Sequence, residues 1–292
     1  MNLQGLTREL SLYLESRVRE GLLASGVGWS LVLCFGAAYA CYYLSSIAKK
    51  PQLVTGSESF CRFLQDHCPV VTEIYYPTVW CWEGRVQTLL RPFITSRPYV
   101  QYRNMLLLNY LGKTGKDTPL KAAAIFSAGW NVFESANSLE KPVNWLLFNY
   151  YLTTCLQSSI TRHRHMFDKL CNMNLVMKAK TIREFDQQFT SVMFGYRTID
   201  DYYADASPCR RLKRIGIPVL CLNSLDDVFS PDHAIPIEIA KQNPNIALIL
   251  TSYGGHIGFL EGLWPRKCTY MDRVFKQFVQ AVFEHGSKIF TT

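Results

Sequence analysis

The sequence predicts an α/β domain with a parallel sheet, preceded by one N-terminal transmembrane helix. Short apolar runs typical of strands alternate with helical patterns over residues 119–286, which is the order of elements in a parallel sheet. Ahead of them, residues 21–48 contain no Asp, Glu, Lys or Arg. With 48% apolar and 18% charged residues, the 292-residue chain is neither disordered nor fibrous.

Residues 21–48 are predicted to span a membrane, because about 20 apolar residues cross a bilayer as a helix. The run is too long for the apolar core of a signal peptide, and no small-residue cleavage site follows it, so a removed leader or a buried core helix is disfavoured. Aromatic residues that suit the membrane interface lie within it, and two lysines close it: Trp29, Tyr39, Tyr42, Tyr43, Lys49 and Lys50. Basic residues flank the run equally, so charge leaves the orientation open.

The rest of the chain divides into three parts. Residues 1–20 form an N-terminal tail, predicted to be a short amphipathic helix because apolar residues recur at four-residue steps. Residues 51–104 are rich in proline and aromatics and are predicted to be extended segments and turns. Residues 105–286 carry the alternating strands and helices, and residues 140–205 within them form a helical insert. A long amphipathic helix near the C-terminus completes this part.

Three strands are expected near residues 122–127, 217–224 and 246–253. Asp226 and Asp227 follow the second strand, and His256 follows the third within "SYGGHIGF". Functional groups gather at the carboxyl ends of parallel strands, so these side chains should meet. An acid paired with a histidine is two thirds of a Ser-His-Asp system, and the acid precedes the histidine as in α/β-hydrolases.

Several stretches resemble the membrane-anchored α/β-hydrolase-domain family: "YYLSSIAKKPQLVTG", "YYPTVWCWEGRVQTLLRPF", "NSLDDVFSP" and "SYGGHIGFLEG". The resemblance covers essentially the whole chain. It implies that Asp227, with Pro231 four residues on, is the catalytic acid and that His256 is the base. It also implies a single-pass membrane protein of the signal-anchor (type II) kind, and phospholipase activity on phosphatidylcholines with medium-length or oxidised acyl chains.

The chain departs from that family between Asn104 and Met105. Family members carry there the early strands of the sheet, the oxyanion-hole loop and the G-x-S-x-G turn with the nucleophile. No G-x-S-x-G occurs in this sequence. The nearest approach is "IFSAG", in which Ser127 follows a strand, but the β-branched Ile125 holds the place of the first glycine in a turn that needs small residues.

We therefore expect a shortened hydrolase domain, lacking central strands, with an open apolar edge, marginal stability and no meaningful esterase activity. A phospholipase, a non-catalytic membrane isoform that binds lipid or active copies, and an acyltransferase are the three hypotheses. The last rests only on His163 and Asp168 in an H-x-x-x-x-D spacing, which a polar helix face matches easily. We expect no cofactor, no metal and no nucleic-acid partner, since the ten cysteines show no zinc spacing and the basic run at 210–214 belongs to no nucleic-acid motif.

Overall fold

The computed structural model describes residues 26–94, 104–265 and 268–286, so the predicted helix in residues 1–20 lies outside the described residues. The chain forms two units, residues 1–48 and residues 49–292. In the first unit, helix α2 (Gly26–Tyr42) continues into a π-helical turn, Tyr43–Ile47. Residues Trp29–Ile47 have a mean hydropathy of 1.5 and are long enough to cross a bilayer, as the sequence predicts.

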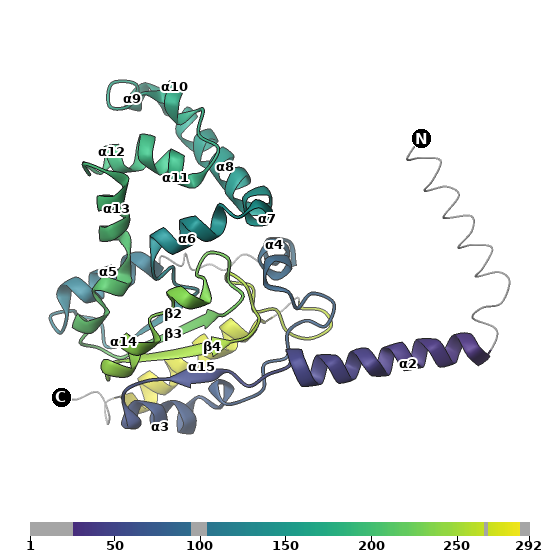
Figure 1. The fold of residues 1–292 in the computed structure, drawn as a ribbon. Coiled ribbons are helices and arrows are strands. Elements are labelled where there is room, and N and C mark those ends of the chain that lie inside the picture. Colours follow the sequence, from purple (N-terminus) through teal and green to yellow (C-terminus); the bar gives the residue numbers. More distant parts are fainter. Residues whose placement is uncertain (1–25, 95–103, 266–267, 287–292) are drawn as a thin grey trace, which may run out of the picture. The chain divides into compact units, whose positions relative to one another are not determined.

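The second unit is built on a four-stranded sheet (Figure 1). Its strands lie in the order β1 (Gln52–Val54), β4 (Ile246–Thr251), β3 (Val219–Ser224) and β2 (Ala123–Phe126). The last three are parallel, and β1 pairs antiparallel with β4. The three strands expected from the sequence are thus confirmed, with ends shifted by one to two residues.

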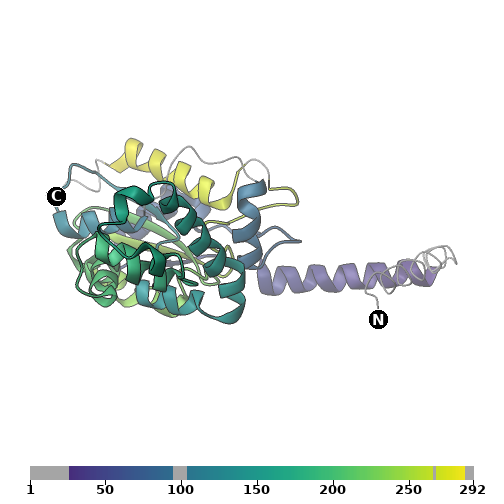
Figure 2. The same cartoon turned by 90° about the horizontal axis from the view of Figure 1, so that it is seen from above.

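Every residue of β3 and β4 is buried, because helices cover both faces of the sheet. One face packs Leu220, Leu222 and Ile249 against α3 (Glu58–His67) and α15 (Tyr270–His285). The other packs alternate strand residues against α5 (Asn104–Thr114) and α14 (Ile237–Gln242). Figure 2 shows α15, in yellow, running along the sheet.

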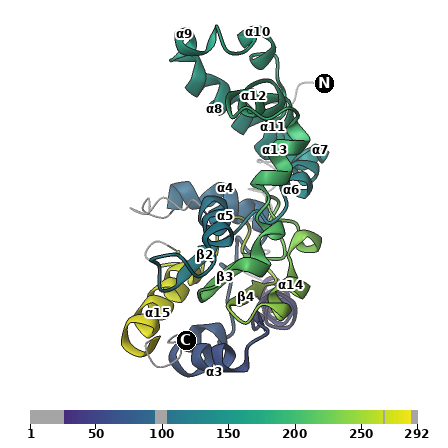
Figure 3. The same ribbon diagram turned by 90° about the vertical axis from the view of Figure 1, so that its left-hand side faces the viewer.

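A group of helices from Val132 to Ala206, here named the cap, projects from the sheet and includes residues 140–205, where a helical insert is predicted (Figure 3). It contains π-helical turns at Trp145–Asn149 and Asp186–Thr190. Its helices are α6 (Val132–Leu139), α7 (Pro142–Asn144), α8 (Tyr150–Thr161), α9 (Arg164–Phe167), α10 (Met173–Val176), α11 (Ile182–Phe185), α12 (Ser191–Met193) and α13 (Ile199–Ala206).

The expectation of extended structure over residues 51–104 is wrong in part, because α3 and α4 (Gly84–Ile94) lie there. Ser57 caps α3 by accepting a hydrogen bond from the Phe60 amide, which starts the helix. Helix α4 buries Gly84, Gln87 and Arg91. Since this buried face is polar, hydrophobic periodicity cannot reveal it.

Strand β2 lies at an edge of the sheet, and β3 is its neighbour. The Ala123 amide donates to the carbonyl of Pro218, just before β3, at 2.9 Å, and the Ser127 amide donates to a β3 carbonyl at 2.8 Å. Since a strand has a period of two, the backbone groups of Ala124 and Phe126 face the outer edge. Among the described residues no further strand pairs with β2, so its outer side is where the sequence leads us to expect an open edge. One outer group is engaged, since the Asn104 side-chain amide donates to the Phe126 carbonyl.

Amide hydrogen exchange should separate this edge from the centre of the sheet. We expect the Ala124 amide to exchange at least about tenfold faster than that of Leu248, since its N–H faces away from β3 whereas β4 has strands on both sides. Exchange of the detergent-solubilised chain followed by mass spectrometry measures both. Equal protection of the two amides would contradict an open edge at β2.

Candidate active site

The loop after β3 places a carboxylate at the end of the sheet. Asp227 is 3% exposed, and its Oδ1 accepts a hydrogen bond from the Phe229 amide at 2.7 Å. That bond closes a short turn of the kind aspartate forms with a backbone two residues on. The carboxylate is thereby fixed in direction, and its Oδ2 remains available to a neighbour.

The loop after β4, which carries His256, has backbone conformations that residues with a side chain rarely adopt. Gly254 and Gly255 have φ of 147° and 58°, and Ile257 and Phe259 follow with φ of 53° and 49°. A Cβ on Gly255 would lie 2.0 Å from the Gly84 carbonyl oxygen, so only glycine fits beside α4. Non-glycine residues at positive φ cost free energy and persist where surrounding contacts hold them.

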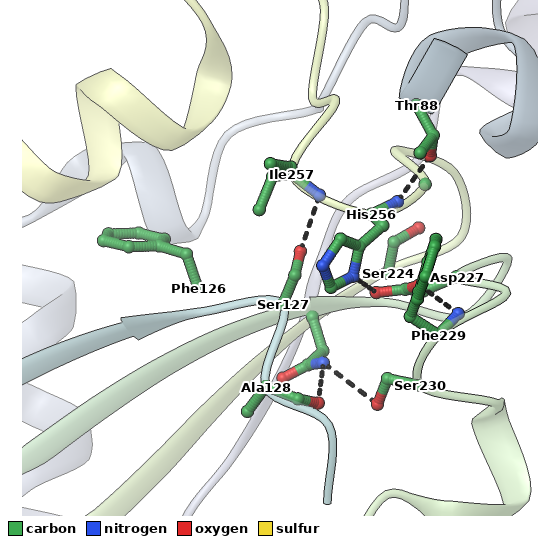
Figure 4. A network of polar contacts seen from close by, with 12 residues as sticks. Thr88, Phe126, Ser127, Ala128, Ser224, Asp227, Phe229, Ser230, His256 and Ile257 are labelled. Carbon is green, nitrogen blue, oxygen red and sulfur yellow. Dashed lines mark hydrogen bonds and ion pairs between the residues drawn. The ribbon is translucent and has the colours of Figure 1, made fainter. Parts of the chain in front are cut away.

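The structure brings the two predicted site residues together (Figure 4). His256 Nδ1 lies 3.0 Å from Asp227 Oδ2, and the Phe229 ring packs on the imidazole at 4.5 Å between centroids. An Nδ1–H that donates to the carboxylate leaves Nε2 as a bare proton acceptor. This is the orientation that a general base needs.

Helix α4 holds the histidine loop through three buried or half-buried side chains on one face. Thr88 Oγ1 accepts from the His256 amide at 2.8 Å, and Gln87 Oε1 accepts from the Leu260 amide at 2.8 Å. The Arg91 guanidinium donates to the carbonyls of Ile257 and Gly258. These contacts satisfy backbone groups that the irregular loop cannot pair within itself. The sequence analysis missed all three residues.

Asp226 is a second carboxylate beside the pair. Its Oδ1 accepts from the Gly255 amide at 2.8 Å and from the Ser224 hydroxyl. Its Oδ2 is shielded from solvent and has no hydrogen-bond partner in the described part of the chain. Burial, with a smaller contribution from the nearby charge of Asp227, raises the pKa of Asp226 to about 6. The carboxylate therefore ties the histidine loop to β3 at a cost in desolvation.

Ser127 lies at the end of β2 with φ of 49°, and it is 2% exposed. Its Oγ accepts a hydrogen bond from the Ile257 amide at 2.9 Å, as Figure 4 shows. Within the described parts of the chain, no hydrogen bond joins it to His256. The helix that follows begins only at Val132, whereas a nucleophile turn leads directly from strand to helix. Ser127 thus supports the histidine loop.

The structure does not bring His163 and Asp168 together as an acyltransferase pair. Asp168 accepts from Arg164 Nε at 3.1 Å, an exposed ion pair one helical turn apart. His163 is exposed at the start of α9. Among the described residues, no group of three His, Cys, Asp or Glu side chains could hold a metal ion. The basic run is partly structural, since Arg211 donates to Asn109 at 2.8 Å and to Asp205.

Comparison with known proteins decides the family. The chain is 56% identical to phospholipase ABHD3 of Bos taurus and of Homo sapiens, in alignments that cover 99% of this chain and 98% of each relative. The chain belongs to the ABHD3 family of α/β-hydrolases. It is also 29% identical over 204 residues to monoacylglycerol lipase of Saccharomyces cerevisiae, covering 66% of this chain and 45% of that protein. No family model and no solved structure matches the chain.

The alignment also measures what this chain lacks. It spans 403 positions, but the chain has 292 residues, so at least 111 aligned positions of the mammalian relatives have no counterpart here. Because the alignment reaches across nearly all of both proteins, these positions are internal to it. The family and its α/β-hydrolase fold are thus as predicted, and its relatives indicate a lipid as substrate.

Removing the acceptor of the His256 amide should destabilise the domain. Thr88→Val keeps the shape of the side chain but leaves that N–H unpaired, so we expect a loss of about 1–3 kcal/mol in the free energy of unfolding. Thr88→Ser retains the hydroxyl and serves as the matched control. Urea unfolding in detergent micelles measures both, and equal stability of the two variants would show that the contact contributes nothing.

The stability of the domain should depend on the charge of Asp226. Its pKa in the folded chain, about 6, exceeds the ordinary value of 3.8, so the folded state binds more protons between these values and stability falls as pH rises through them. Asp226→Asn should therefore gain on the order of 2 kcal/mol over the parent chain at pH 8 and nothing at pH 4. The exposed Asp117→Asn is the control, and a gain that is independent of pH would refute the assignment.

Proposed function

We propose that this chain is a membrane-anchored member of the phospholipase family that keeps the acid–base pair but does not hydrolyse esters. The apolar helix Trp29–Ile47 is its single-pass anchor, of type II by resemblance to the family. Asp227 acts as the orienting acid and His256 as the base. The family reaction is the hydrolysis of carboxylic esters in phosphatidylcholines with medium-length or oxidised acyl chains.

The observation that carries the proposal is the state of the Ser127 hydroxyl at the end of β2. Ser127 Oγ is buried and accepts the Ile257 amide. The G-x-S-x-G turn is absent from the whole sequence. Serine catalysis needs the hydroxyl, the imidazole and oxyanion donors together, and loss of the nucleophile alone lowers turnover about 10⁶-fold in a well-studied serine hydrolase. A lipid-binding role, alone or with active copies, is what this chain retains.

One observation favours a second candidate, hydrolysis through Ser127 itself. The positive φ of Ser127 resembles the strained turn of a nucleophile, and its strand lies next to the one that precedes Asp227. Against it stand the burial of the side chain and the distance in sequence to the next helix. The two candidates predict opposite results with a serine-reactive probe.

We expect a fluorophosphonate probe to leave the purified chain unlabelled, because no serine of the described segments forms a hydrogen bond with His256. A full-length mammalian relative, labelled under the same conditions, is the positive control. Turnover of a medium-chain phosphatidylcholine should be the same for the parent chain and for His256→Ala. Labelling that Ser127→Ala abolishes, or turnover that depends on His256, would replace this proposal with hydrolysis through Ser127.

A further inference from the structure

The outer end of the cap, residues 162–180, is here named the cap tip. Figures 1 and 3 show its two short helices, α9 and α10, at the end of the cap farthest from the sheet. The tip is held by two bonds from one side chain, since Gln157 Nε2 of α8 donates to the carbonyls of Val176 and Ala179, each at 2.9 Å. It is a structured projection on a short stem of helices.

The cap tip has an apolar core of its own. Met173, Val176 and Phe185 are at most 3% exposed and cluster with further apolar residues of the tip and its neighbours: Ile160, Phe167, Cys171, Ala179 and Phe189. The rings of Phe167 and Phe189 meet edge to face at 5.0 Å between centroids. Residues outside this cluster are therefore not needed to fill the interior of the tip.

Four large apolar side chains of the tip nevertheless face solvent. Met166 and Leu170 are 59% and 58% exposed, and Leu175 and Met177 are 45% and 40% exposed. Along the sequence, these exposed residues alternate with the buried residues of the tip's core. The tip therefore has apolar side chains on its outside as well as in its interior. Several large apolar side chains exposed within one projecting segment indicate a contact with another molecule or with a membrane.

The charge around these side chains indicates what the tip contacts. The tip contains one acidic residue, Asp168, which forms an ion pair with Arg164. It also contains five exposed basic residues: Arg162, Arg164, Lys169, Lys178 and Lys180. Its net charge of +4 is half of the chain's +8 within 19 residues. Apolar side chains among lysines and arginines, on a projecting segment, fit the interface of an anionic bilayer, which offers phosphates above an acyl layer.

We propose that the cap tip inserts Met166, Leu170, Leu175 and Met177 into the headgroup layer of an anionic membrane while its basic residues bind the lipid phosphates. The inference rests on the proposed membrane anchoring, which brings the second unit to a bilayer. It needs no catalytic serine. The contact turns the cap into a second, charge-selective attachment to the membrane.

The test places the full chain in lipid nanodiscs of phosphatidylcholine alone or mixed with phosphatidylserine. Amide exchange of residues 162–180 should be slower in the mixed discs, and high salt should remove the difference because it screens the charges. Lys169→Glu with Lys178→Glu and Lys180→Glu should abolish the protection. So should glutamine at the four exposed apolar positions. Identical exchange in both kinds of disc overturns the proposal.

A matched control reverses three exposed lysines outside the cap, Lys113→Glu, Lys116→Glu and Lys121→Glu, and should keep full protection of the tip. Loss of protection in this control would show a response to net charge alone. Protection by soluble heparin without lipid would assign the tip to a polyanion instead. If the chain fails to enter discs, the anchoring proposal fails, and flotation of the same variants with phosphatidylserine vesicles then decides on the tip alone.

Discussion

The loop that carries His256 depends on hydrogen bonds from outside itself. Positive φ at Ile257 and Phe259 turns several backbone groups away from one another, and α4, β2 and β3 supply their partners. Because Thr88, Ser127 and Asp226 come from three separate parts of the sequence, the loop forms only when the sheet and α4 have assembled. The pairing of His256 with Asp227 is thus a consequence of the whole second unit.

The same dependence explains how an acid–base pair persists in a chain shorter than its relatives. Strands β3 and β4 pair along six residues, and helices bury both. The two loops that carry Asp227 and His256 leave these strands at one end of the sheet, and the side chains that hold the histidine loop lie in segments that this chain retains. What the chain lacks, at least 111 positions of the mammalian alignment, leaves this part of the architecture intact.

The sequence predicts the parts of the molecule whose structure follows from the pattern of apolar residues. The continuous apolar runs of β3 and β4 predicted parallel strands, and the residues after them predicted the pair of Asp227 and His256. The same pattern fails for α4, whose buried face carries glutamine, threonine and arginine that bind backbone rather than pack. The only signal was their spacing, "QTLLR", one helical turn between the first and the last. Such contacts depend on a loop distant in sequence, which no local pattern reports.

The side chain of Asn104 has a consequence for solubility. An edge strand invites a strand of another molecule to add to it through its outward carbonyls and amides. At β2 the carbonyl of Phe126 is already occupied by the Asn104 amide, which comes from the first residue of α5. An arriving strand would have to displace that amide to continue the ladder. One side chain from a neighbouring helix thereby competes with strand addition at this carbonyl of the edge strand.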